Sequence, residues 1–98
     1  MTYLVFCVFE LKDASREDSL YAYMDFATLG MRRIVKSENG PSFKLPASAV
    51  MGMFDGRSVE DVRSIVGKKV EGLFKARGLS ADFFIVASAD WACAGEST

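Results

Sequence analysis

Apolar side chains occupy both alternating faces of the first long stretch of the chain, residues Thr2 to Leu11 (TYLVFCVFEL). Successive side chains of a β-strand point to opposite sides, so Tyr3 begins one apolar row and Leu4 begins the other. Only Glu10 places a charge in the second row. A strand that is apolar on both sides requires cover on both sides, which predicts the central strand of a sheet.

Residues Arg16 to Leu29 carry the signals of a first helix. Ser15 followed by Asp18 predicts a capping box at its start, and Gly30 predicts its end. The spacing predicts an inward stripe that consists of Leu20, Tyr23, Met24 and Ala27, with Met31 beyond the helix. Tyr21 and Phe26 lie beside this stripe, where they either widen the buried face or contact a partner chain or a nucleic-acid base.

A second helix is predicted from Ser58 to about Arg77, with Ser58 as the cap and Gly78 as the stop. Its inward apolar residues recur at helical spacing and are Val59, Val62, Ile65, Val66, Val70 and Leu73. Gly67 and Gly72 lie inside this helix, where each destabilises it by up to about 1 kcal/mol relative to alanine. Either close packing or chance explains their presence.

Three further apolar segments predict strands at Met31 to Ser37, Ala49 to Phe54 and Asp82 to Ser88. Gly52 interrupts the second of these and indicates a bulge or a close approach of another backbone. The intervening residues 38–46 are rich in turn formers and predict a connection. We therefore expect one domain over residues 1–90 and a tail over residues 91–98, with Trp91 as its large anchor.

The predicted order of elements is βαββαβ. Short connections and right-handed crossovers then favour an α+β fold, namely a ferredoxin-like sandwich whose antiparallel sheet has the strand order 4-1-3-2, with both helices on one face. The first and third strands are apolar on both sides, as expected for the two central positions. The sheet face away from the helices would then expose Leu4, Phe6 and Val8. A homodimer through that face, or the tail laid across it, would cover these side chains.

Composition narrows the possible chemistry. Half of the residues are hydrophobic, and 12 basic residues face 13 acidic ones, so charge neither favours nor excludes a nucleic-acid partner. The chain has no histidine, and its two cysteines, Cys7 and Cys93, lie far apart, which argues against a zinc site. No apolar run approaches the length of a membrane helix or has the flanks of a signal peptide, so we expect a cytoplasmic protein without a membrane partner.

Several short motifs resemble a known family. These motifs are the TY-L-V opening, the G-M-x-x-I-V stretch after the first helix, the turn from Glu38 to Pro41 that leads to Leu45-Pro46, and the start of the second helix at Ser58. Together with the order of elements, they resemble the GhoS-like endoribonuclease antitoxins of type V toxin–antitoxin systems. That family belongs to a wider ferredoxin-like group with VapD-type ribonucleases and the CRISPR adaptation nuclease subunit. The resemblance implies an RNA-processing dimer with an acidic residue near the end of the first strand.

Glu10 and Asp13 are the candidate catalytic residues because they lie at that strand end. Val8 cannot act as an acid, so Glu10 and Asp13 are the nearest carboxylates available. Converging carboxylates, with Asp82 at the start of the last strand, could hold Mg²⁺, which prefers oxygen ligands and activates water. The alternative is that these are ordinary solvated charges at the ends of strands. We expect no other cofactor.

Basic residues gather on the second predicted strand and the connection after it. The candidate nucleic-acid-binding residues are Arg32, Arg33, Lys36 and Lys44, with Tyr21 as a stacking platform. The alternative is that the cations protect an edge strand against aggregation.

Three functions remain open from the sequence. The first is a small dimeric RNA-binding protein or endoribonuclease of the GhoS-like kind. The second is a non-catalytic homodimeric regulatory module that binds protein through the open sheet face. The third is a small-molecule-binding dimer, for which an enclosed apolar pocket would be the sign.

Overall fold

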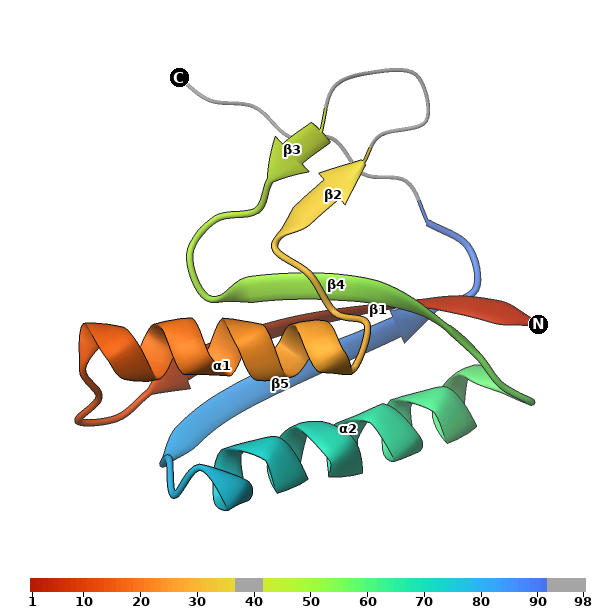
Figure 1. The fold of residues 1–98 in the computed structure, drawn as a ribbon. Helices are drawn as coiled ribbons and strands as arrows, with labels where there is room; N and C mark the ends of the chain where they lie inside the picture. The colour runs from red at the N-terminus through yellow and green to blue at the C-terminus, as the bar shows by residue number, and fades with distance from the viewer. Residues whose placement is uncertain (37–41, 92–98) are drawn as a thin grey trace.

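The computed structural model describes residues 1–36 and 42–91. Its elements are β1 (Thr2–Leu11), α1 (Arg16–Thr28), β2 (Ile34–Lys36), β3 (Ser42–Lys44), β4 (Ala49–Asp55), α2 (Val59–Ala76) and β5 (Ala81–Ser88). The predicted α+β class, with antiparallel strands and two helices, is therefore confirmed in the described part of the chain (Figure 1). Neither helix is long and apolar enough to cross a membrane.

The main sheet has three strands in the order β4-β1-β5, and both pairings are antiparallel. The prediction of a central first strand is confirmed, because β1 has a hydrogen-bonded neighbour on each side. Its residue Phe6 stands opposite Met51 of β4 and Val86 of β5. Directly opposed residues share a face of the sheet, so these pairings define which side chains lie together on each side.

The predicted four-stranded order 4-1-3-2 is not present as one continuous sheet. The second strand is shorter than expected, and it pairs with β3, in a segment that the sequence assigned to a connection. Among residues 1–36 and 42–91, a single bridge between Arg32 and Met51 joins this hairpin to β4, through two backbone hydrogen bonds of 2.9 and 3.0 Å. The chain bends at Arg33, directly after the bridge, and its later hydrogen bonds go to β3 instead (Figure 1).

Both helices cover the same side of the main sheet, where they enclose the hydrophobic core (Figure 1). The alternate β1 residues Tyr3, Val5, Cys7 and Phe9 are buried against them. Phe9 contacts Phe26 of α1, with ring centroids 5.0 Å apart, and Phe74 of α2, at 5.8 Å. Such aromatic contacts add to the free energy gained by burying the rings, which ties β1 to both helices.

The capping box of α1 is confirmed, but its predicted inward stripe is wrong in part. Ser15 Oγ accepts a hydrogen bond from the Asp18 amide, and Asp18 Oδ2 accepts one from the Ser15 amide. However, Leu20 is 54% exposed and Met24 is 60% exposed, whereas Phe26 is fully buried. Apolar residues surround this helix on most sides, so its contacts with the sheet and α2 determine which side faces inward.

The second helix follows its predicted pattern more closely. Ser58 Oγ accepts a hydrogen bond from the Asp61 amide, as the cap prediction requires. The buried residues recur every four positions and are Val62, Val66, Val70 and Phe74. Ile65 is 47% exposed, so its place in the predicted stripe is wrong, and the buried Phe74 is a residue that the predicted stripe left out.

Candidate functional site

The side of the main sheet away from the helices carries a contiguous set of apolar side chains, which we call the open face. Its exposed members are Val8, Met53, Phe84 and Val86, its half-buried members are Leu4 and Phe6, and Ala49 and Met51 of β4 lie on the same side but are buried. Phe84 stands opposite Val8 across the β1–β5 ladder and is 65% exposed, the largest exposure on this face. Single exposed apolar side chains are common on protein surfaces, whereas a contiguous patch over three strands indicates a binding surface.

Charged groups mark the ends of the open face. At one end Glu10 and Asp82 stand directly opposite each other, and Lys12 Nζ lies 3.2 Å from Asp82 Oδ1. At the other end Thr2 Oγ1 donates a hydrogen bond of 2.6 Å to Asp55 Oδ1. The apolar centre is therefore bounded by polar corners, an arrangement found in protein interfaces.

A hollow of about 450 Å³ lies at the acidic end of the open face. It is lined by Val8, Phe9, Glu10, Ala47, Ser48, Asp82, Phe83 and Phe84. This hollow is open to solvent rather than enclosed, so it differs from the pocket that would favour a small-molecule-binding function.

The two candidate catalytic residues lie at and just beyond the end of β1, near this end of the open face. Glu10 is exposed on the open face, whereas Asp13 follows the strand, is also exposed, and has a positive φ of 50°. Within residues 1–36 and 42–91 no group of three carboxylate or cysteine side chains is placed to hold a metal ion. Lys12 also engages Asp82, one of the carboxylates of the Mg²⁺ site that the sequence suggested, and we derive no step through a metal.

The candidate nucleic-acid-binding residues separate into two places. Arg32 and Lys44 are exposed on or beside the β2–β3 hairpin, while the Lys36 side chain lies outside the described residues. Arg33 is half-buried, and its guanidinium carbon lies 4.1 Å from the centre of the Tyr23 ring. Tyr21 is not near this group, because its ring lies beneath Arg77, at 4.6 Å, where α1 meets the end of α2.

Tyr23 is the α1 aromatic that contacts the hairpin region, a role that the sequence did not reveal. Its hydroxyl oxygen accepts a hydrogen bond of 2.7 Å from the Ser48 amide, and Ser48 has a positive φ of 66°. Its ring also supports Arg33, whose Nε is buried without a hydrogen-bond partner in the described part of the chain. The Tyr23–Arg33 contact thus stabilises the start of the hairpin, and Arg32 and Lys44 are the exposed cations among the hairpin side chains that the structure describes.

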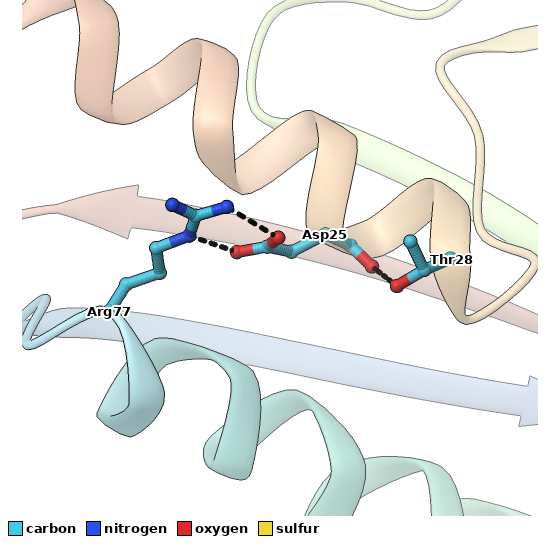
Figure 2. Close-up of polar contacts among 3 residues, drawn as sticks. All are labelled: Asp25, Thr28 and Arg77. Atoms are coloured by element: carbon cyan, nitrogen blue, oxygen red, sulfur yellow. Dashed lines mark hydrogen bonds and ion pairs between the residues drawn. The ribbon is translucent and has the colours of Figure 1, made fainter.

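An ion pair joins the two helices on the side of the main sheet away from the open face. Figure 2 shows Arg77 donating two hydrogen bonds, of 2.7 and 3.0 Å, to the Asp25 carboxylate. Thr28 Oγ1 donates to the Asp25 carbonyl oxygen in the same view. The hydrogen bond to Asp25 raises the pKa of the Arg77 guanidinium above its ordinary value. All these groups are matched by partners, so the cluster has a structural role.

No family model, curated protein or solved structure matches this chain. A fold class alone does not define an activity, so the open face and the hairpin are the surfaces that bear on function.

Cys7 is expected to resist thiol reagents at neutral pH in the folded protein. It is fully buried on β1, and burial raises its pKa from 9.0 to about 12, which keeps it protonated and unreactive. The unfolded chain loses the thiol proton near pH 9 while the folded chain retains it, so stability should fall as the pH rises from about 9 to 12. Alkylation of a Cys93→Ser variant, with and without denaturant, checks the reactivity. Rapid labelling of the folded variant would contradict the burial of Cys7.

Proposed function

We propose that this protein is a non-catalytic homodimeric interaction module whose open face binds the open face of a second copy. The observation that carries the proposal is the exposure of contiguous apolar side chains over β1, β4 and β5, with Phe84 65% exposed. Burial of such a surface is favourable by roughly 25 cal/mol for each Å² of apolar area removed from water. Exposure of this face to water is therefore unfavourable, which favours its burial against another protein surface.

Charge placement supports a second copy as the occupant. Arg32 stands opposite Met51 at the β4 side of the face, and Glu10 lies at the far end of β1. A two-fold axis that runs obliquely across the centre of the face would bring Arg32 of each copy toward Glu10 of the other. One surface thus carries both members of a complementary charge pair, as a self-associating interface requires.

The test is a charge placed at the centre of the open face. Val8→Lys is expected to halve the molar mass measured by light scattering at tens of micromolar protein, because a buried ammonium group without a partner opposes association. Leu20→Lys is the matched control, since Leu20 is 54% exposed on α1, on the helical side of the molecule. An unchanged mass for Val8→Lys, or an equal loss for Leu20→Lys, would contradict the proposal.

A second candidate function is RNA binding by the basic hairpin, as the GhoS-like resemblance implies, with Glu10 or Asp13 acting in cleavage. Arg32 and Lys44 favour it, because both are exposed and neither forms an ion pair with the described carboxylates. Exposed cations of this kind can contact a phosphate backbone.

Binding of a labelled RNA pool at two salt concentrations distinguishes this second candidate. Salt-sensitive binding that is lost in Arg32→Ala/Lys44→Ala would support it, with Lys68→Ala/Lys69→Ala on α2 as a control of equal charge. Cleavage that is lost in Glu10→Ala would add an enzymatic role. Equal RNA binding by both double variants would show that the hairpin does not contact the RNA.

A further inference from the structure

The outer edge of β5 presents unused backbone hydrogen-bonding groups. The Phe9 amide of β1 donates to Ser48 on the β4 side, whereas the Lys12 amide donates to Ser80 on the β5 side. Successive residues of an antiparallel strand bond to opposite neighbours, so the even-numbered residues of β1 bond to β5. In the observed register, even-numbered residues of β1 stand opposite even-numbered residues of β5, so the even-numbered residues of β5 form their backbone hydrogen bonds with β1. The N–H and C=O groups of Phe83, Ile85 and Ala87 therefore point outward, away from the sheet.

This edge lacks the devices that usually prevent strand-to-strand pairing. Ala81–Ser88 contains no proline, lysine or arginine, and Asp82 is its only charge. In the described part of the chain, no backbone hydrogen bond from another segment reaches the three outward residues. The opposite edge of the sheet, at β4, differs, because the outward N–H and C=O groups of Met51 form hydrogen bonds with the backbone of Arg32. The β5 edge is thus ready to accept another strand.

We propose that β5 pairs antiparallel with β5 of a second copy about a two-fold axis at Ile85, joining two three-stranded sheets into one. In this register Phe83 stands opposite the small Ala87 of the second copy, and Phe84 stands opposite its Val86. Asp82 stands opposite Ser88, so no like charges meet.

The register centred on Phe84 would instead place Asp82 against Val86, a charge against an apolar side chain. Pairing about Ile85 also places the outward groups of both strands in hydrogen-bonded pairs.

The α2 helix fits the same axis. Gly67 lies over Ile85, because a Cβ added at Gly67 would contact Ile85 Cδ1 at 3.9 Å. The two copies of α2 would therefore run antiparallel on either side of the axis, with Gly67 at the crossing. Helices pack with their axes 8–10 Å apart, and a residue without a side chain allows the closer part of that range. This contact supplies a reason for a glycine that destabilises an isolated helix.

Charges on either side of Gly67 are complementary in that arrangement. Arg63 and Glu71 each lie one helical turn from Gly67, on the same face of α2, and both are exposed. Antiparallel packing places Arg63 opposite Glu71 of the second copy. Lys75 contacts Glu71 at 2.8 Å within one chain, but such exposed pairs are weak and exchange partners readily.

The edge and the open face are different surfaces, so the edge is tested in a background where the face is disabled. Each of the two contacts joins two copies, so the unmodified protein would contain both, and the Val8→Lys protein, with half that molar mass, is expected to be a dimer held by the β5 edge alone at tens of micromolar. Arg63→Glu and Glu71→Arg should each raise its dissociation constant at least about tenfold, since like charges then face each other, and the double variant should restore it. A monomeric Val8→Lys protein, or a double variant as weak as the single ones, would overturn the edge proposal and leave the face proposal standing.

A proline substitution tests the strand pairing itself. Ala87→Pro, again in the Val8→Lys background, removes an outward N–H group without breaking a hydrogen bond to β1, so the chain should remain folded and become monomeric. Ala87→Val is the control, because it keeps the N–H group and should stay dimeric. Circular dichroism checks the fold of both variants. A folded Ala87→Pro protein that remains a dimer would overturn the proposal.

Discussion

Replacing Phe26 with alanine is expected to lower the free energy of unfolding by about 3–5 kcal/mol. Phe26 is fully buried, and its ring centre lies 5.0 Å from that of Phe9 and 5.6 Å from that of Phe74. Truncation would remove the contacts that join α1 to both β1 and α2, and the cavity left behind would close only in part. Urea denaturation monitored by circular dichroism measures the change.

Two residues of the same helix provide the control for Phe26. The hydrophobic spacing of the sequence predicted Leu20 and Met24 as inward residues, yet they are 54% and 60% exposed. Leu20→Ala and Met24→Ala should therefore change the free energy of unfolding by less than about 0.5 kcal/mol. If either truncation were as destabilising as that of Phe26, α1 would have to be rotated from its position in this structure.

Replacing Gly52 with alanine is expected to destabilise the fold by about 3 kcal/mol, at the upper end of the usual effect of overpacking. A Cβ at Gly52 would overlap the carbonyl oxygen of Gly30, in the turn that follows α1. Backbone atoms cannot move aside as a flexible side chain can, so either β4 or the end of α1 would have to shift. Thermal and urea unfolding would show the loss.

Gly72 provides the matched control for Gly52. It lies in the interior of α2, and apart from its chain neighbours and the backbone of its own helix no described atom lies within 4 Å of the Cβ that alanine would add. Gly72→Ala should therefore stabilise the protein by up to about 1 kcal/mol, the difference in helix propensity. Glycine-to-alanine substitution is thus expected to lower the free energy of unfolding at Gly52 and to raise it at Gly72. Destabilisation by Gly72→Ala, or a neutral Gly52→Ala, would show that these backbones are packed differently.

The local elements were largely predictable from the sequence because their signals are local. The span of β1 follows from its nearly continuous apolar run, and the start of each helix follows from the side chain of Ser15 or Ser58. The row that begins at Leu4 also indicated an apolar sheet face away from the helices. The close approach suggested by Gly52 was likewise one of two expectations from the sequence, and the structure identifies Gly30 as the approaching backbone.

The assignment of aromatic residues on α1 was not predictable, because apolar side chains surround that helix. Tertiary contacts decide that Phe26 faces the core, that Tyr23 contacts the hairpin and that Tyr21 lies under Arg77. Sequence spacing alone could not separate these three environments.

The surfaces available for binding depend on partners far apart in the chain. The sequence by itself determined that β1 is central and that its second apolar row needs cover. Only the tertiary structure decided that β5 adds Phe84 to that row and that no other described segment pairs with its outer edge. It also decided that the hairpin turns away from β4 after the bridge at Arg32. The physical reason is that β1 pairs with β4 and β5 through residues far apart in the chain, and the hydrophobic pattern that sets register along a strand does not say which strands become neighbours.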